Sequence, residues 1–168
     1  MIGLALIQVL RAAGCGRIIA VDVMPEKLAL AVKVGATNTV NSAVANGVEE
    51  ILRLTNGIGS DLAFEAVGVA ATVGLALGCV RKGGSVTLLG NVAPTVNFPL
   101  QVAVTRELTL YGSCASCGDY PACLDLMARG TITAAPLLSA VAPLAEGAAW
   151  FDRLYRKEPG LLKVVLKP

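Results

Sequence analysis

The chain has 168 residues, of which 55% are hydrophobic and 15% charged, and its net charge is +2. It is long enough for one domain with a sizeable core and too apolar to be disordered, and the absence of a basic run argues against nucleic acid as a partner. The sequence contains no histidine, which removes the commonest general base and the commonest metal ligand. The apolar, uncharged stretch over residues 66–80 is too short to span a membrane, and we expect a cytoplasmic protein without membrane attachment.

The first elements read as helix, strand and helix. An apolar helix over Gly3–Ala13 precedes a strand over Arg17–Val23, whose run of apolar residues is typical of a strand buried on both faces. That strand ends on the carboxylate of Asp22. Pro25 then begins a helix that runs to Val34, because proline suits the first helical position.

The same alternation continues to about residue 130. The predicted elements are a strand over Thr37–Val40, a helix to Thr55 with an inward stripe of Val44, Val48, Ile51 and Leu52, a strand over Asp61–Ala66, a helix over Ala70–Val80, a turn at Gly83 and Gly84, strands over Ser85–Leu89 and Leu108–Gly112, and a helix over Asp119–Arg129 with Cys123, Leu124 and Met127 facing inward. Alternation with short connections favours parallel strands joined by right-handed crossovers.

The last 35 residues differ in character. Pro136 and Pro143 bracket a predicted loop, and Pro143 begins a helix with an apolar stripe of Leu144, Ala148, Phe151 and Tyr155. Leu161–Lys167 is a predicted final strand. We therefore divide the chain into a domain over residues 1–135 and a tail over residues 136–168.

Gly3 and Asp22 indicate what the domain binds. A glycine at a helix start, followed about 20 residues later by an acid at the next strand's end, is the second half of the dinucleotide-binding fingerprint. Its first strand and first two glycines would precede Met1. The predicted fold class is thus α/β, a doubly wound (Rossmann-type) parallel sheet that lacks its first strand, with a helix–strand tail.

Six segments resemble the zinc-dependent, medium-chain alcohol dehydrogenases, especially their polyol branch of sorbitol, galactitol-phosphate and threonine dehydrogenases. The segments are IGLALIQVLRAAG, VDVMPEKLALAVKVGATNTVN, DLAFEAVG, GGSVTLLG, RELTLYGS and LLKVVLK. The resemblance implies oxidation of a secondary alcohol or polyol by NAD, with zinc held in a front half that this chain lacks. It also implies that no residue here is catalytic, that the fragment alone has no turnover, and that the intact enzyme is a homo-oligomer joined near Val96–Leu110. The strand over Leu161–Lys167 would return to the front half and should be poorly paired here.

Asp22 is the strongest candidate for cofactor binding. Its carboxylate can accept hydrogen bonds from the adenosine ribose hydroxyls and would repel a 2′-phosphate, which favours NAD over NADP; the alternative is a solvated acid at a strand end. By resemblance Lys27 lies beside the same ribose, although a solvent-facing helix lysine fits the spacing equally well. Gly3 would allow close packing of the first helix against its strand and lead its N-terminus toward the pyrophosphate.

Three further segments follow successive strands and should share one edge of the sheet. They contain the candidate residues Val67, Gly68, Gly90, Asn91, Ser113 and Ala115. In the family such positions line the cofactor and bond the nicotinamide carboxamide through main-chain groups; the alternative is glycines required only by turn geometry.

The remaining reactive side chains do not form a recognisable site. Cys114, Cys117 and Cys123 lack a fourth thiol at zinc-site spacing, so we predict no metal site and a core position for Cys123. Glu65 and Glu107 are acids flanked by apolar residues, and for Glu107, which follows Arg106 just before a strand, we expect a structural ion pair rather than catalysis. Asp119 is expected at a helix start, and Asp125 and Arg129 form a predicted i,i+4 pair.

Three other functions remain open from the sequence. A zinc-free, NADPH-dependent quinone or enoyl reductase is disfavoured by Asp22, a methyltransferase is disfavoured by the tail, and a non-catalytic nucleotide-binding or interaction module describes the isolated chain well. The topology gives a structural test: the strands over Arg17–Val23 and Leu62–Ala66 should lie two strand spacings apart, roughly 9–10 Å, or close up on each other.

Overall fold

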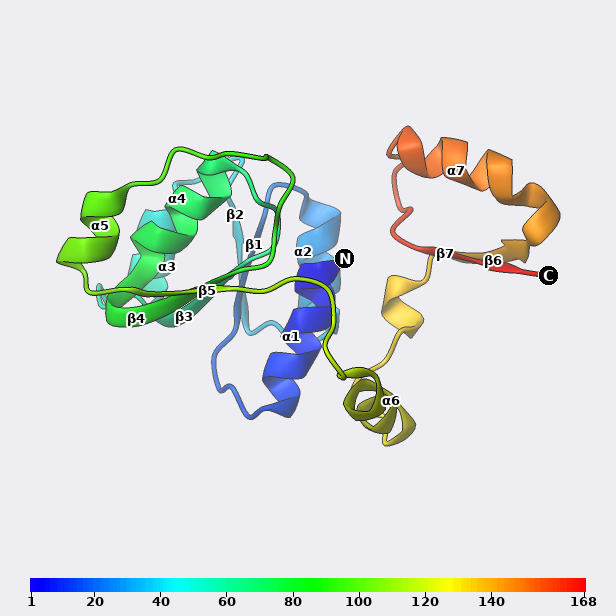
Figure 1. Ribbon diagram of the computed structural model, residues 1–168, viewed down its shortest axis with the longest axis horizontal. Helices are drawn as coiled ribbons and strands as arrows, with labels where there is room; N and C mark the ends of the chain where they lie inside the picture. Colours follow the sequence, from blue (N-terminus) through cyan, green and yellow to red (C-terminus); the bar gives the residue numbers. More distant parts are fainter. The chain divides into compact units, whose positions relative to one another are not determined.

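The computed structural model describes residues 1–168, and its helices and strands alternate along most of the chain (Figure 1). The helices are α1 (Ile2–Ala12), α2 (Pro25–Lys33), α3 (Gly47–Leu54), α4 (Ala70–Cys79), α5 (Leu100–Thr105), α6 (Tyr120–Ala128) and α7 (Gly147–Tyr155), with short 3-10 turns η1 (Ala135–Leu137) and η2 (Leu144–Glu146). The strands are β1 (Ile19–Asp22), β2 (Asn38–Asn41), β3 (Ser60–Glu65), β4 (Val80–Leu88), β5 (Thr109–Gly112), β6 (Ala140–Pro143) and β7 (Val164–Lys167). No helix is long and apolar enough to cross a membrane.

The chain forms two compact units, and each is described separately. The first contains residues 1–20, 25–38 and 121–168, and the second contains residues 21–24 and 39–120. The α/β class with parallel strands, predicted from the sequence, is confirmed.

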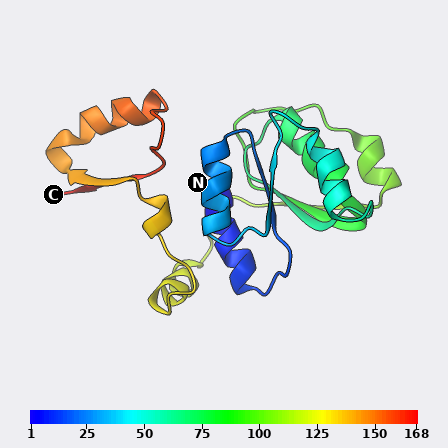
Figure 2. The same cartoon turned by 180° about the vertical axis from the view of Figure 1, so that it is seen from behind.

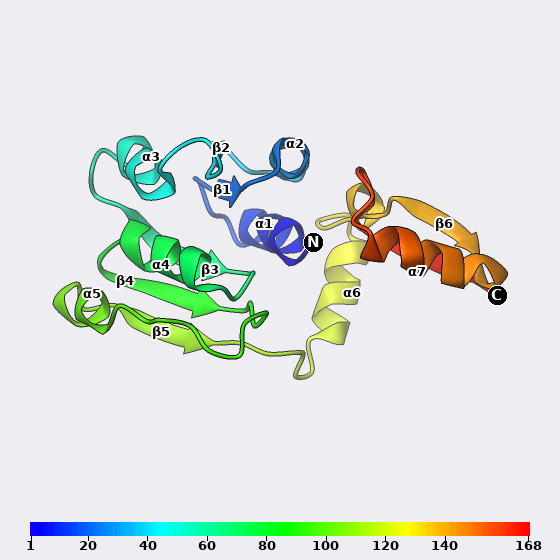
Figure 3. The ribbon, with the colours of Figure 1, turned by 90° about the horizontal axis from the view of Figure 1, so that it is seen from above.

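The second unit is built on a parallel sheet of order β3-β4-β5. Figure 3 shows these three strands side by side and pointing the same way. Helices α3 and α4 contact each other, and α4 also packs on β3 and β4, as Figure 2 shows from behind. Leu77 of α4 and Val80 and Val86 of β4 are completely buried, so the core of this unit lies between α4 and the sheet.

Strands β1 and β2 form a separate two-stranded sheet. No strand of the chain pairs with both β1 and β3, and the two are not hydrogen-bonded to each other. The predicted alternative in which these two strands close up on each other is therefore wrong, and no other strand takes the position between them.

The core of the first unit joins the inner face of α1 to residues from the region of β1 and α2. Its buried members are Leu4, Ile7, Ile18, Ala31, Val34 and Ala36. Gln8 is also buried, and its side-chain amide exchanges two hydrogen bonds with the main chain of Thr133, at 3.1 and 2.8 Å. This pair satisfies the buried amide and ties α1 to the segment after α6.

The tail differs from the prediction in three ways. Residues 140–143 form the strand β6, where the sequence predicted a loop, and α7 begins at Gly147 after a 3-10 turn rather than at Pro143. Strand β7 is not poorly paired, because it pairs in parallel with β6 over four residues, from Ala140↔Val164 to Pro143↔Lys167. The extended conformation of residues 140–143 supplies the neighbour that the sequence analysis had not recognised.

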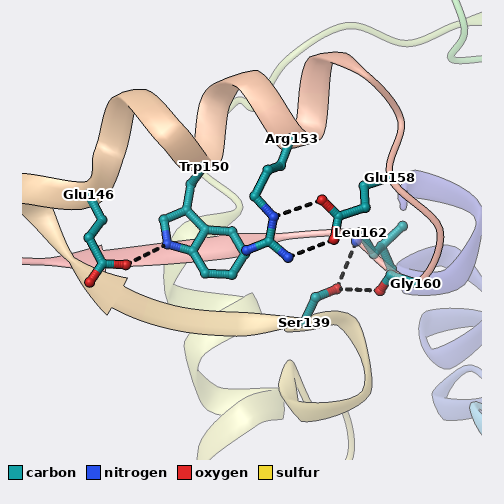
Figure 4. A network of polar contacts seen from close by, with 7 residues as sticks. All are labelled: Ser139, Glu146, Trp150, Arg153, Glu158, Gly160 and Leu162. Atoms are coloured by element: carbon teal, nitrogen blue, oxygen red, sulfur yellow. Dashed lines mark hydrogen bonds and ion pairs between the residues drawn. The ribbon is translucent and has the colours of Figure 1, made fainter.

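A chain of polar contacts runs along α7 (Figure 4). Glu146 accepts the indole N–H of Trp150 at 3.1 Å, and the guanidinium of Arg153 lies 4.0 Å from the centre of the Trp150 ring. Arg153 donates two hydrogen bonds to Glu158, at 2.7 and 2.6 Å. These hydrogen bonds lower the pKa of Glu158 and raise that of Arg153.

Ser139, the residue just before β6, forms hydrogen bonds to the turn just before β7. Its hydroxyl donates to the carbonyl of Gly160 at 3.1 Å and accepts the N–H of Leu162 at 2.7 Å (Figure 4). Its own N–H donates to Lys163 at 2.8 Å. These bonds align the two segments just before β6 and β7 begin to pair.

The apolar faces predicted for two helices are not buried. Cys123, Leu124 and Met127 of α6 are exposed, so their assignment to the core is wrong: no buried residue lies on α6. The stripe of α7 is also exposed, with Phe151 at 71% and Tyr155 at 87%. Val44 lies outside α3 and is exposed, because the helix begins only at Gly47 after the Asn46 cap.

Candidate functional site

Asp22 lies at the last position of β1, where the sequence places it. One carboxylate oxygen, Oδ1, accepts the N–H of Met24 at 3.0 Å, and the main-chain carbonyl accepts the N–H of Ser42 at 3.2 Å. The residue is half-buried and takes part in none of the ion pairs of the chain. The turn toward α2 therefore fixes the carboxylate through one oxygen, and the other oxygen remains available to a ligand.

The two other candidates near the start of the chain, Lys27 and Gly3, each lie in the first turn of a helix. Lys27 lies in the first turn of α2 and is half-buried. Gly3 lies in the first turn of α1, but a methyl group at this position would meet no atom within 4 Å. No part of this chain packs closely against Gly3.

The register of the β3-β4-β5 sheet brings the other candidates to one edge. Glu65 of β3 is level with Leu88 of β4, which in turn is level with Gly112 of β5. Because all three strands are parallel, the segments that follow them leave the sheet at the same edge, where open α/β sheets hold their ligands. Asp22 belongs to the same compact unit as these segments.

Two of these segments, residues 65–68 and 89–93, pair with each other, and we call them the paired loops. The carbonyl of Glu65 accepts the N–H groups of Leu89 at 2.8 Å and Gly90 at 3.1 Å. Further along, the N–H of Val92 donates to Val67 at 3.3 Å and that of Ala93 donates to Gly68 at 2.9 Å. The two loops are thus joined by main-chain hydrogen bonds beyond the ends of their strands.

Gly68 and Gly90 are required by the close approach of the paired loops. A Cβ at Gly68 would overlap main-chain atoms of Gly90 and Asn91, and a Cβ at Gly90 would overlap those of Val67 and Gly68. Gly68 also has φ = +85°, a conformation that other residues adopt only with strain. The turn-geometry interpretation of these glycines therefore holds, whatever ligand the edge binds.

The buried side chain of Glu65 binds the main chain of the first paired loop. It is 3% exposed, and its carboxylate accepts the N–H of Val67 at 2.8 Å and the N–H of Gly68 at 2.9 and 3.0 Å. Both amides are consequently occupied, so neither Val67 nor Gly68 offers a ligand a free main-chain donor. Glu65 forms no ion pair, because these amides take the place of a cation.

The remaining candidates on this edge are exposed. Asn91 and Ser113 are both accessible, and the N–H of Ser113 donates to Leu88 at 3.0 Å. Ala115 is exposed and has φ = +55°. This third segment therefore leaves the sheet at the expected place, with its side chains toward solvent.

The other reactive side chains show no site of their own. No group of three or more Cys, Asp or Glu side chains is arranged to hold a metal ion, and Cys114 and Cys117 are exposed free thiols. Glu107 forms the predicted ion pair, with Lys82 at 3.0 Å, and both side chains are mostly exposed. Asp125 and Arg129 form the predicted i,i+4 pair at 2.5 Å.

The role of Glu65 was not predicted from the sequence, where it stands out only as an acid flanked by apolar residues. The signal that could have revealed the role is the position of the acid at a strand end, two and three residues before the amides of a tight glycine turn.

Comparison with known proteins identifies the family. Residues 2–129 match the family model described as zinc-binding dehydrogenase. The chain belongs to this family. Its fold, a Rossmann-type α/β domain, is the fold of the cofactor-binding half of these dehydrogenases.

Similar members of the zinc-binding dehydrogenase family are about twice as long as this chain. Sorbitol dehydrogenase of Bacillus subtilis is 31% identical over 99% of the chain and 48% of its own length. An alcohol dehydrogenase from a Thermus species is 37% identical with a TM-score of 0.89, again over 99% of this chain and 48% of that one. A protein of Sinorhizobium meliloti solved with bound NADP is 30% identical with a TM-score of 0.87, over 99% and 49%.

The family is named for a zinc ion, but this chain has no group of residues suited to bind zinc. There is no histidine, and the cysteines and acids do not gather into a coordinating group. The residues of the candidate site instead suit a dinucleotide: a carboxylate at a strand end, followed along the chain by a glycine-containing edge.

Proposed function

We propose that the chain is the NAD(H)-binding portion of a zinc-dependent dehydrogenase that transfers hydride between a secondary alcohol or polyol and NAD. The polyol is suggested by sorbitol dehydrogenase among the relatives. In this proposal no residue of the chain touches the reacting alcohol. The chain's own task is to bind and orient the nicotinamide nucleotide, and by itself it has no turnover.

The observation that supports this most strongly is the state of Asp22. Its carboxylate is placed by the Met24 amide, is half-buried, and is not neutralised by an ion pair. A carboxylate held in this way at the end of a parallel strand is the group that hydrogen-bonds both ribose hydroxyls of an adenosine. An acid retained only for solubility would not need the amide to fix it.

We propose NAD rather than NADP as the cofactor. A 2′-phosphate carries close to two negative charges at neutral pH, which the carboxylate of Asp22 would repel, and no arginine follows Asp22 within four residues. The S. meliloti protein, solved with NADP, shows that relatives can take the phosphorylated cofactor. Asp22 is therefore the residue on which the preference depends, and the alternative of an NADPH-dependent reductase is disfavoured.

Several finer assignments belong to the same proposal. Residues 1–135 would bind the dinucleotide, with Gly3 near the pyrophosphate and Lys27 beside the ribose, and residues 136–168 would contact the part of the enzyme that holds the zinc. Val67, Gly68, Gly90, Asn91, Ser113 and Ala115 would line the nicotinamide end. We further propose a cytoplasmic homo-oligomer without nucleic-acid or membrane partners.

The proposal is tested by titrating the chain with NADH and NADPH and following nicotinamide fluorescence. We expect weak but saturable binding of NADH and weaker binding of NADPH, with no reduction of NAD in the presence of sorbitol. Asp22→Asn keeps the size of the side chain and removes its charge, and it should reduce the difference between the two cofactors. The proposal fails if neither cofactor binds, or if NADPH binds more tightly than NADH.

A further inference from the structure

Glu65 has a position to which the proposed function assigns no role. It is buried, it forms no ion pair, and every hydrogen bond of its carboxylate comes from a main-chain amide. Its own carbonyl accepts the Leu89 and Gly90 amides of the neighbouring loop. One residue thus holds the turn after β3 with its side chain and the turn after β4 with its main chain.

The chemistry at this position requires a carboxylate. A buried charge is costly unless hydrogen bonds compensate it, and here Oε1 accepts two amides while Oε2 accepts the Gly68 N–H at 3.0 Å. A glutamine would place an NH₂ group where one of these oxygens lies, so that a donor would face the Gly68 N–H. The shape of the side chain would be preserved, but one acceptor would be lost.

The position of Gly68 in turn determines that of the second paired loop. The carbonyls of Val67 and Gly68 accept the amides of Val92 and Ala93, and Gly68 lies directly against Gly90 and Asn91. Along residues 89–93 the amides of Leu89, Gly90, Val92 and Ala93 are all bonded within the chain. The amide of Asn91 has no such partner, and Asn91 is an exposed residue, so this is the one amide of residues 89–93 without a main-chain partner in the chain.

We propose that Glu65 is a positioning residue for the nicotinamide end of the cofactor, acting through the Val67 and Gly68 amides on the paired loops and thereby on Asn91. This inference rests on the proposed function, because it requires that a nicotinamide nucleotide binds at this edge. Glu65 does not contact the cofactor. It holds the loops that do.

Three variants separate positioning from mere folding. Glu65→Gln keeps the shape and removes one acceptor, whereas Glu65→Asp keeps both acceptors on a shorter side chain. A shorter side chain can reach such amides, since Asn46 in the same chain accepts the corresponding amides of Val48 and Glu49 at 3.1 and 3.4 Å. Glu107→Gln, at an exposed glutamate of the same unit, is the matched control.

The first readout needs no cofactor. Amide hydrogen exchange of the full chain, measured by NMR, should be about tenfold faster at Gly68 and at Ala93 in Glu65→Gln, the effect of one lost hydrogen bond in a buried site, and close to wild type in Glu65→Asp and Glu107→Gln. Unchanged exchange at both amides in Glu65→Gln would overturn the inference.

The second readout compares NADH with ADP-ribose, which lacks the nicotinamide. We expect Glu65→Gln to weaken NADH binding about tenfold and to leave ADP-ribose binding unchanged, with recovery of NADH binding in Glu65→Asp. Equal losses for both ligands would mean a general structural role and would overturn the inference. If the wild-type chain binds neither ligand, the proposed function fails and the positioning role with it, while hydrogen exchange still reports whether the carboxylate holds the loops.

Discussion

Replacing Gly68 by alanine tests whether the paired loops approach each other as closely as the structure indicates. The added methyl group would overlap main-chain atoms of Gly90 and Asn91 and would lie 2.6 Å from the carbonyl oxygen of Gly90. These are main-chain atoms of a loop that is tied on both sides, by the bond of the Gly90 N–H to Glu65 and by the bonds of the Val92 and Ala93 N–H groups to Val67 and Gly68. They cannot rotate away as the end of a flexible side chain can.

Two costs add in Gly68→Ala. A φ of +85° costs an alanine about 1–2 kcal/mol relative to glycine. Forcing a methyl group into a filled space costs about 1–3 kcal/mol more. The free energy of unfolding should therefore fall by roughly 2–5 kcal/mol, a large part of the stability of a domain of this size.

The measurement is urea unfolding followed by circular dichroism, with Gly74→Ala as the matched control. Gly74 lies in α4 of the same unit, and a methyl group there would meet no atom within 4 Å. The control should be stabilised by about 0.5–1 kcal/mol, because alanine favours a helix over glycine. The reasoning is refuted if Gly68→Ala is as stable as wild type or if the two variants change stability in the same direction.

Four further predictions follow from single contacts. Leu77→Ala should lower the free energy of unfolding by about 2–5 kcal/mol, because Leu77 is fully buried in the core of the second unit; a loss below 1 kcal/mol in urea unfolding would contradict this. Because the Arg153 hydrogen bonds lower the pKa of Glu158 in the folded state, this pair stabilises the protein above the ordinary glutamate pKa of 4.5, and the contribution is lost as pH falls through the lowered value. The stability difference between wild type and Glu158→Gln should thus be present at pH 7 and shrink as the pH falls below 4.5, and a difference independent of pH would exclude the ion pair as its cause. Ellman's reagent should label Cys114, Cys117 and Cys123 rapidly and Cys79 slowly, because burial raises the pKa of the Cys79 thiol; equally rapid labelling of Cys79 would argue against the core position of α4. Gln8→Ala should speed proteolysis between α6 and η1, because the Thr133 main chain loses both of its partners, whereas cleavage at the wild-type rate would show that this contact does not anchor the segment.

The sequence predicted most of the first 112 residues because their elements are short, regular and strongly patterned. Pro25 begins α2 as predicted, and the buried run before Asp22 forms the strand that places this carboxylate. One local difference in this region is at Gly83 and Gly84, which were predicted as a turn. They lie inside β4, in an irregular stretch where Ser60 pairs with Val80 but Leu62 pairs with Ser85.

The assignment of residues to the core was wrong where no other part of the chain covers the apolar face of a helix. The spacing of Leu124 and Met127 on α6 predicts a buried face, but both side chains are exposed. Periodicity shows only which residues share a face of a helix, not what covers that face. Helix α5 was not predicted, because six residues are too few to show a helical period. Strand β6 was predicted as a loop because of Pro136 and Pro143.

The candidate site was predicted in position but not in its hydrogen bonding. The sequence placed Gly68, Gly90 and Ser113 after successive strands, and the sheet register brings those strand ends level. It did not show that Glu65 occupies the amides of Val67 and Gly68, because a side-chain bond to a turn two and three residues later leaves no repeating pattern. The glycines were recognised, whereas their reason, the mutual contact of two loops, needed the structure.

The most direct test of the account is an NMR titration of the labelled chain with NADH. The account predicts that the amide of Met24, which donates to Asp22, and that of Asn91 shift together with a single dissociation constant, while amides of β6 and β7 remain unchanged. In Asp22→Asn the NADH-dependent shift at Met24 should require a concentration of NADH about tenfold higher. Shifts confined to β6 and β7, or a Met24 amide that does not respond to NADH, would contradict the claim that this carboxylate binds the nucleotide.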